Sequence, residues 1–293
     1  MSDLILHAAN LNNDFPPGSL PNLQAALEVG ISRIEVDIIP LKDGDFALLH
    51  DPRLEKISES MGNVVDQDSP TIRSIRYKNH PVAFGTLAQA VPLLKNQSSL
   101  DFLQLDLKPY APLTPACLMS LLDIIQPLRS AVLVSTVADW AVRLLHRLAP
   151  DLRLGFDPLL YLDIGSAETR EAGVPPFRSG AYGYLDEHPL AAQRWGDLGD
   201  YFSARADALL QQVPAGTTWF INAQLLSDAL QAGFNWIEYL HHAGSQVDAW
   251  TLDMDRAEMA LHLSKAGVDY ITSNQYQALR AVLEAGHPNS EGF

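Results

Sequence analysis

Short apolar runs alternate with stretches of helical periodicity along almost the whole chain, and this constrains the fold more than any other feature. The runs are rich in Val, Ile and Leu, which is typical of parallel strands buried on both faces. We expect strands at Leu4–His7, Arg33–Ile38, Phe46–His50, Phe102–Leu107, Ala131–Ser135, Arg153–Phe156, Trp219–Asn222, Val247–Leu252 and Tyr270–Thr272. The sequence therefore predicts repeated βα units around a parallel sheet.

The segments between these runs carry the apolar spacing of amphipathic helices. We expect helices at Leu20–Val29, Thr86–Leu94, Thr114–Ile125, Ala138–Leu148, Leu198–Gln212, Ala223–Ala232, Asn235–Ala243, Arg256–Ala266 and Gln275–Ala285. Parallel strands joined by crossover helices predict the α/β class and a (β/α)8 TIM barrel. Phe46–His50 follows a hairpin-type turn at Asp43-Gly44, so it is the strand in excess of eight, joined to its neighbour by a tight turn.

The 293 residues contain no Pro/Ser linker and no fixed-period repeat, so we expect one domain over residues 1–293. Residues 157–214 are the least patterned part of the chain and contain Pro175-Pro176 and several tyrosines. This pattern indicates a long insertion after a strand, which we expect to lie over the C-terminal face of the barrel.

Charge and composition exclude several classes of protein. Twenty basic and 35 acidic residues give a formal charge of −15, which argues against nucleic-acid binding and requires a local positive centre for any anionic substrate. The single cysteine, Cys117, excludes an intramolecular disulfide and fits a reducing compartment. Without a signal-peptide pattern or a membrane-length apolar run, we expect a cytoplasmic protein with no stable membrane anchor; its oligomeric state stays open.

Acidic side chains fall at the ends of two expected strands. Glu35 and Asp37 alternate with apolar residues and share one face, and Asp106 and Lys108 repeat the pattern on a later strand. An isolated pair of this kind usually marks the solvent-exposed face of an edge strand, but the strands of a closed barrel are covered on both faces. Three convergent carboxylates suit one hard divalent cation, Mg²⁺ or Ca²⁺, whereas zinc prefers nitrogen or sulfur ligands.

Two histidines, His7 and His50, also close expected strands. A lone histidine in such a place is more often structural, but two beside a carboxylate cluster can divide the roles of general acid and general base. Asp51 either orients a histidine or opens the turn before Pro52. Asp253 and Asp255 read as the acidic start of a helix.

In this order, the motifs resemble the glycerophosphodiester phosphodiesterase family over nearly the whole chain. They are His7, Glu35-x-Asp37, Lys42-Asp43-Gly44, His50-Asp51, Asp106-x-Lys108, Trp250-Thr251, Gly267-Val268-Asp269 and Thr272-Ser273-Asn274. The resemblance implies a (β/α)8 barrel, with Glu35, Asp37 and Asp106 as metal ligands and His7 and His50 as the acid/base pair. It also implies that Lys108 contacts the phosphate and that Trp250 lines the pocket, although packing against the barrel core explains Trp250 equally well.

The chain departs from the family pattern at several positions. Where the family has His-Arg-Gly, this sequence has His7-Ala8-Ala9, so a phosphate-binding arginine is missing; the Pro-Glu-Asn-Thr segment has become Pro16-Pro17-Gly18-Ser19. Asp106 replaces the usual glutamate, and Asn274 stands where the family commonly has Asp. The missing arginine, Asp106-x-Lys108 and Asn274 resemble the related sphingomyelinase D toxin branch. His50-Asp51-Pro52 and the Glu55–Ser74 stretch resemble the glycerophosphodiesterases, so the substrate cannot be copied from either branch.

We therefore expect a metal-dependent phosphodiesterase that cleaves a glycerophosphodiester or a lysophospholipid-like diester by His/His acid–base catalysis. The nucleophile is either a substrate hydroxyl, which gives a cyclic phosphate first, or water. One alternative is a barrel that binds a phosphorylated small molecule and cleaves it weakly or not at all. Another is an unrelated sugar-phosphate enzyme, which the glycine-free Thr272–Gln275 segment disfavours.

Overall fold

A closed barrel of eight parallel strands forms the centre of the computed structural model, which describes all residues except 12–13, 96, 98–99, 163–196 and 287–293. The barrel strands are β1 (Asp3–Leu6), β2 (Arg33–Pro40), β4 (Phe102–Leu107), β5 (Val132–Thr136), β6 (Arg153–Phe156), β7 (Thr218–Asn222), β8 (Val247–Trp250) and β9 (Tyr270–Ser273). Leu6 of β1 pairs with Ile34 of β2 and with Ser273 of β9, and these pairings close the cylinder. The predicted TIM barrel is thus confirmed.

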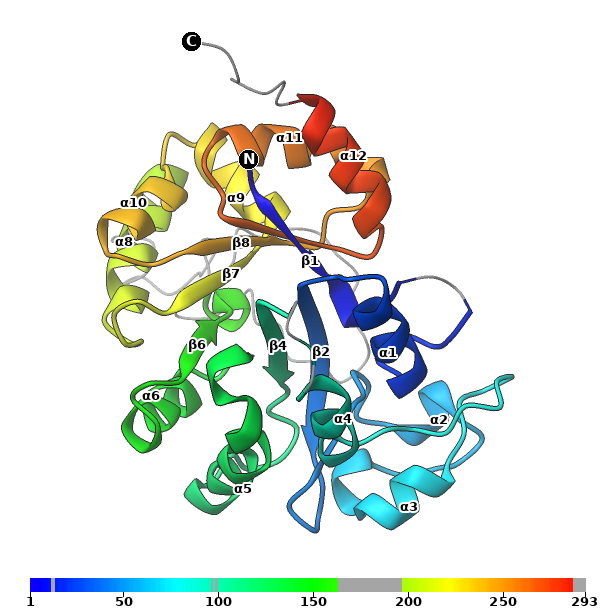
Figure 1. The fold of residues 1–293 in the computed structure, drawn as a ribbon. Coiled ribbons are helices and arrows are strands. Elements are labelled where there is room, and N and C mark those ends of the chain that lie inside the picture. The colour runs from blue at the N-terminus through cyan, green and yellow to red at the C-terminus, as the bar shows by residue number, and fades with distance from the viewer. Residues whose placement is uncertain (12–13, 96, 98–99, 163–196, 287–293) are drawn as a thin grey trace.

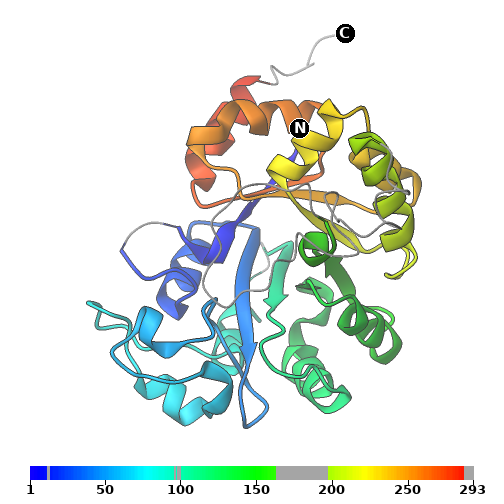
Figure 2. The same cartoon turned by 180° about the vertical axis from the view of Figure 1, so that it is seen from behind.

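Helices form an outer ring around the strands (Figures 1 and 2). They are α1 (Leu20–Glu28), α2 (Leu54–Ile57), α3 (Ser69–Ser74), α4 (Leu87–Leu94), α5 (Pro115–Ile125), α6 (Asp139–Leu148), α8 (Leu198–Leu210), α9 (Ala223–Gln231), α10 (Trp236–His242), α11 (Ala257–Lys265) and α12 (Tyr276–Gly286). Short 3₁₀ helices lie at His7–Ala9, Val64–Asp66, Gln126–Ala131, Pro158–Tyr161 and Met254–Arg256. Within the described residues, none of the helices has both the length and the apolar character needed to cross a lipid bilayer.

The ninth strand, β3 (Phe46–Ala47), pairs antiparallel with the end of β2, as the turn at Asp43-Gly44 predicts. It is shorter than the expected Phe46–His50, so His50 lies in the loop that follows it. Between β3 and α4 the chain packs a small satellite core, which includes Val64 and Ile72 and lies beside the end of β2. The short helices α2 and α3 belong to this core and are too brief to produce a periodic signal.

The barrel strands bury both faces. Ile34, Val36 and Ile38 of β2 join the main core under the helices, and the residues between them point into the barrel. Ile5, Phe102, Leu133 and Phe220 fill the barrel interior as a separate apolar cluster. The interior is therefore packed, and a side chain at the carboxyl end of a strand faces the rim above this packing. Residues 163–196 of the expected insertion lie outside the described residues.

Candidate active site

A pocket of about 400 Å³ opens at the carboxyl ends of the barrel strands. Its lining contains all seven site residues expected from the sequence: His7, Glu35, Asp37, His50, Asp106, Lys108 and Trp250. They come from five separate segments of the chain, which the barrel brings to one rim. The part that each residue plays stays a prediction, but their gathering in one place is a property of the fold.

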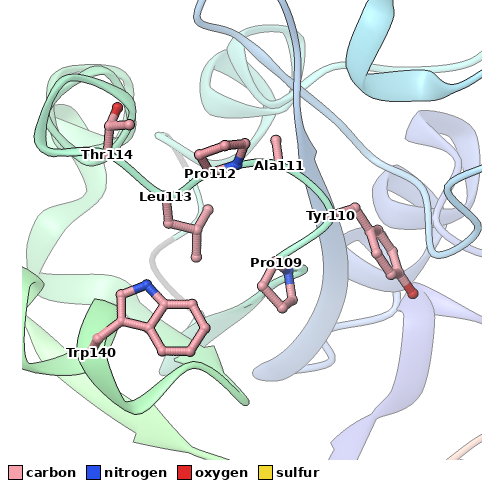
Figure 3. Close-up of a pocket in the computed structure, with 7 residues that line it drawn as sticks. All are labelled: Pro109, Tyr110, Ala111, Pro112, Leu113, Thr114 and Trp140. Atoms are coloured by element: carbon pink, nitrogen blue, oxygen red, sulfur yellow. The ribbon is translucent and has the colours of Figure 1, made fainter. Parts of the chain in front are cut away.

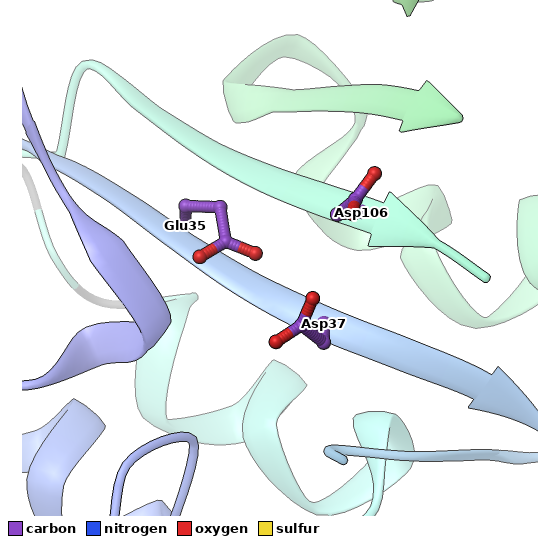
Figure 4. Close-up of side chains that lie close together, drawn as sticks. All are labelled: Glu35, Asp37 and Asp106. Atoms are coloured by element: carbon purple, nitrogen blue, oxygen red, sulfur yellow. The ribbon is translucent and has the colours of Figure 1, made fainter. Parts of the chain in front are cut away.

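Three carboxylates form the centre of this pocket. Glu35 and Asp37 project from β2 and Asp106 from the neighbouring β4, where Asp37 and Asp106 are direct register partners (Figure 4). One oxygen of each lies within 4.8 Å of the others, and Glu35 and Asp37 are only 4% and 7% exposed. Burial raises the pKa of Glu35 well above its usual value, and the charges of Asp37 and Asp106 raise it further.

One cation, Lys108, faces this cluster. Its Nζ lies 2.8 Å from Asp37 Oδ1 and 2.6 Å from Asp106 Oδ2. Burial by itself lowers the pKa of Lys108, but the two carboxylates outweigh burial and raise that pKa above its usual value, so the ammonium stays charged at neutral pH. Three carboxylates and one ammonium still leave an excess of negative charge, which a divalent cation would neutralise.

The backbone beside His7 takes an unusual course. Ala8 and Ala9 have φ angles of 50° and 46°, in the left-handed region that costs a non-glycine residue about 1 kcal/mol or more. This course lets the Ala8 N–H donate to Glu35 Oε2 at 2.6 Å, and it leaves His7 Nε2 3.8 Å from the same oxygen. The strained segment therefore ties the first histidine to the carboxylate cluster.

His7 has a fixed orientation. Asn274 Nδ2 donates to Asp253 Oδ2 at 3.0 Å, because a carboxylate can only accept, and the amide oxygen of Asn274 therefore faces His7 Nδ1 at 2.7 Å. The Nδ1–H group must then be the donor, so in the neutral tautomer of this ring the lone pair lies on Nε2. Asp253, expected to begin a helix, makes no capping bond of its own and instead accepts from the side chain and backbone of Asn274.

Other polar groups in the pocket were not anticipated. Ser135 donates to Asp106 Oδ1 at 3.0 Å and accepts from Gln104 Nε2 at the same distance. Asp157, at the end of β6, also lines the pocket, and burial raises its pKa well above the usual value despite the hydrogen bond from the Leu159 N–H. The signal available for Asp157 is its place directly after a strand, the same place that drew attention to His7.

Two buried polar atoms of pocket residues have no hydrogen-bond partner within the described part of the chain. They are the amide oxygen of Gln104, an acceptor, and the indole Nε1 of Trp250, a donor. Trp250 also packs against the apolar cluster inside the barrel, so it both lines the pocket and contacts the barrel core. Buried polar groups are normally paired, which makes these two atoms candidates for contact with a polar ligand.

The chain matches the glycerophosphoryl diester phosphodiesterase family over residues 11–157, half of its length. A glycerophosphodiester phosphodiesterase from Caldanaerobacter subterraneus subsp. tengcongensis is 25% identical over 170 residues, which are 55% of this chain and 68% of that protein.

Solved structures show the same fold at lower identity. An Oleispira antarctica phosphodiesterase, in complex with the product sn-glycerol-3-phosphate, has a TM-score of 0.67 and 18% identity over 97% of both chains. A putative glycerophosphoryl diester phosphodiesterase from Agrobacterium tumefaciens has a TM-score of 0.69 and 14% identity, over 99% of this chain and all of that one. With the family match, this similarity places the chain among the phosphoric diester hydrolases: it belongs to the glycerophosphodiester phosphodiesterase family.

Proposed function

We propose that the protein hydrolyses glycerophosphodiesters in a reaction that depends on a divalent cation and on proton transfer by His7 and His50. The observation that carries this proposal is the convergence of three carboxylates, one ammonium and two histidines on a single pocket. A pocket of about 400 Å³ suits a small-molecule substrate.

The donor set fits a hard divalent cation, because Glu35, Asp37 and Asp106 offer only carboxylate oxygens and lie within 4.8 Å of one another. These three residues would hold the ion, and Mg²⁺ and Ca²⁺ both accept such ligands. When bound, the cation would act as a Lewis acid toward a non-bridging phosphate oxygen. The three carboxylates give the pocket an excess of negative charge. We therefore expect an anionic phosphodiester to bind only when the cation neutralises that charge.

The two histidines divide the proton transfers. In the neutral ring of His7 the lone pair lies on Nε2, because Asn274 accepts from its Nδ1–H, so His7 suits the role of general base toward the attacking hydroxyl. His50 lines the same pocket from the loop after β3, and it would protonate the oxygen of the departing alcohol. The attacking hydroxyl belongs either to the glycerol of the substrate, which gives a cyclic phosphate first, or to water.

Lys108 would contact the phosphate, since its ammonium lies between Asp37 and Asp106. Ala8 offers only its backbone at the place where the family carries an arginine, and its N–H is committed to Glu35. A lost arginine donor in a buried site can cost a few kcal/mol of transition-state stabilisation, so we expect slower turnover than in a family member that keeps it.

The substrate class follows from the polar groups that line the pocket. The unpaired oxygen of Gln104 and the indole N–H of Trp250 can accept from and donate to the hydroxyls of a polyol such as glycerol. The bound product in the Oleispira antarctica structure, sn-glycerol-3-phosphate, is compatible with this chemistry. We therefore propose that glycerophosphodiesters are cleaved to sn-glycerol-3-phosphate and a free alcohol, and that lysophospholipids are cleaved to 1-acyl-glycerol-3-phosphate and a free alcohol.

The test is the release of sn-glycerol-3-phosphate from glycerophosphocholine with Mg²⁺ or Ca²⁺, before and after chelation. His7→Ala and His50→Ala should each lower kcat by a hundredfold or more, about the contribution of a positioned acid or base. His241→Ala is the matched control, because His241 pairs with Asp269 away from the pocket and its loss should leave kcat unchanged. Equal rates in wild type, His7→Ala and His50→Ala would contradict the proposal and favour a barrel that only binds phosphorylated ligands.

A further inference from the structure

A groove of about 500 Å³ lies on the surface between the loops that follow β4 and β5. One wall is the 109–114 loop, which leads from Lys108 to α5, and the other is Trp140 in the first turn of α6 (Figure 3). The described residues that line the groove carry no charged side chain: Pro109, Tyr110, Ala111, Pro112, Leu113, Thr114 and Trp140. An uncharged groove is unusual at the rim of a protein whose net charge is −15.

The groove adjoins the catalytic pocket at Pro109. Pro109 lines both of them, and Val137, which lines the catalytic pocket, lies three positions before Trp140 on the second wall. Pro109 directly follows Lys108, whose ammonium contacts Asp37 and Asp106. A ligand whose phosphate lies at the carboxylate cluster can therefore extend outward along Pro109 into the groove.

Trp140 gives the groove its apolar character. Its side chain is 47% exposed, whereas Leu113 across the groove is only 6% exposed. Figure 3 shows the indole turned toward Pro109 and Leu113, while Tyr110 extends away from it. The carboxylate next to Trp140, Asp139, is bonded to Arg143 at 2.5 Å and to the Tyr161 hydroxyl at 2.8 Å, so it is not left free to repel an apolar ligand.

We propose that this groove binds the hydrocarbon chain of a monoacyl phosphodiester, so that lysophospholipids with medium or long chains are preferred substrates. The proposal rests on the proposed phosphodiesterase function. Flat indole and proline rings can cover methylene groups, and the uncharged walls offer no partner for a second ionic headgroup. A fully buried methylene strengthens binding about fourfold; a shallow groove covers only one side of a chain, so about twofold per carbon is expected.

The experiment compares glycerophosphocholine with 1-acyl-glycerophosphocholines of six, eight and ten carbons, all kept below their micelle concentrations, by choline release. In the wild type, kcat/KM should rise about twofold per added carbon. Trp140→Ala should lower the ratio of kcat/KM for the ten-carbon ester to that for glycerophosphocholine by about tenfold or more, and Trp140→Phe should restore part of it. Leu148→Ala, an exposed apolar position at the opposite end of α6, should keep the wild-type ratio.

Calorimetric titration with the ten-carbon ester in the presence of Mg²⁺, with His50→Ala added to the wild type and to each variant so that the ester is not cleaved, gives a second readout that needs no turnover. Weaker binding by Trp140→Ala than by wild type and Leu148→Ala would support the groove. The proposed groove is overturned, even if all substrates are cleaved, if Trp140→Ala keeps the wild-type ratio of kcat/KM values and binds the ten-carbon ester as tightly as wild type. No choline release from any ester by the wild type would instead refute the proposed function. If Trp140→Ala weakens only sedimentation with phosphatidylcholine vesicles, the groove contacts bilayers and the proposal is wrong.

Discussion

The two ends of the barrel differ in how far their charged side chains are exposed to water. At the amino-terminal ends of the strands, Arg33 lies between Asp3 and Asp101, at N–O distances of 2.9 and 2.8 Å. At the carboxyl ends, the ammonium of Lys108 contacts Asp37 and Asp106, and the third carboxylate of the cluster, Glu35, accepts from the Ala8 N–H. The side chains of Asp3 and Asp101 are 54% and 46% exposed, so water screens the negative charge that the one guanidinium leaves uncompensated, whereas Glu35 and Asp37 are buried.

This difference separates stability from function. A carboxylate that keeps its charge without a partner in a buried position destabilises the fold, so a cluster of three is retained for what it can bind. The ion pairs of Arg33 need no such explanation, because Asp3 and Asp101, which share its guanidinium, are about half exposed and stay in contact with water. The comparison therefore predicts that removing a carboxylate at the carboxyl rim lowers kcat and raises the free energy of unfolding. Substitutions at the amino rim should change the free energy of unfolding and leave kcat unchanged.

The largest expected effect is at Glu35. Glu35→Gln removes one charge from the cluster, so kcat with Mg²⁺ should fall about a thousandfold or more, because a metal ligand is lost. Without divalent cations, the free energy of unfolding should instead rise by about 1 kcal/mol, since a buried like-charge contact is relieved. Activity assays and urea unfolding of the same preparation measure both changes.

Asp101→Asn is the matched control for Glu35→Gln, because it removes a carboxylate from the opposite end of the barrel. It should lower the free energy of unfolding and leave kcat unchanged. If Glu35→Gln destabilises the metal-free protein as Asp101→Asn does, the contrast between the two ends is wrong.

Asp248, inside the barrel between the two ends, should make stability depend on pH. Burial raises its pKa to about 7, against about 3.9 in the unfolded chain, and the Thr272 hydroxyl only partly offsets this. A raised carboxyl pKa means that stability is lost as pH rises from about 4 to about 7. Between pH 5 and pH 8, wild type should therefore lose about 2 to 3 kcal/mol more than Asp248→Asn. If urea unfolding shows that the free energy of unfolding changes equally in the two proteins between pH 5 and pH 8, this prediction is wrong.

Asn274 should affect catalysis without entering the reaction. Asn274→Ala removes the acceptor that fixes His7 Nδ1–H, so kcat should fall about ten- to a hundredfold, the usual cost of losing such a supporting hydrogen bond. Its pH–rate profile should also shift, because the His7 ring is then free to change tautomer. Asn274→Asp should restore part of kcat. An unchanged profile in Asn274→Ala would show that the contact is only structural.

Arg33 gives the smallest expected effect. Arg33→Met should lower the free energy of unfolding by about 1 kcal/mol, the upper range for a partly exposed ion pair, and should leave kcat unchanged. Arg280→Met is the control, since the Arg280–Glu284 pair is largely exposed and its loss should be close to neutral. A loss of activity in Arg33→Met would mean that the two ends of the barrel are coupled.

The sequence predicts the barrel well because strand periodicity is a local signal. Ile34, Val36 and Ile38 alternate with Glu35 and Asp37, so the residues that face the core and those that face the rim can be assigned from one short segment. The gathering of His7, Asp106 and Trp250 then follows from barrel closure. By contrast, α2 and α3 are too short to carry a helical period, and they were missed.

The contacts that orient the site could not be predicted, because they join distant parts of the chain. His7 and Asn274 are 267 positions apart, and Asn274 is itself held by Asp253, whose pattern indicates only the start of a helix. The groove beside Trp140 is formed by the 109–114 loop and the first turn of α6, and no periodicity describes the course of that loop. Side-chain partners and loop shapes therefore have to be taken from the folded chain.

The most direct test of the account is anomalous diffraction from crystals soaked in Mn²⁺, which reports where a divalent cation binds. We predict one dominant peak in contact with a carboxylate oxygen of each of Glu35, Asp37 and Asp106, at distances within the range of about 2.0 to 2.6 Å that Mg²⁺ and Ca²⁺ oxygen ligands span, and no such peak in Glu35→Gln crystals. A peak elsewhere, or no peak at the three carboxylates with Asp37 and Asp106 still paired to Lys108, would contradict the claim that this rim is a metal centre.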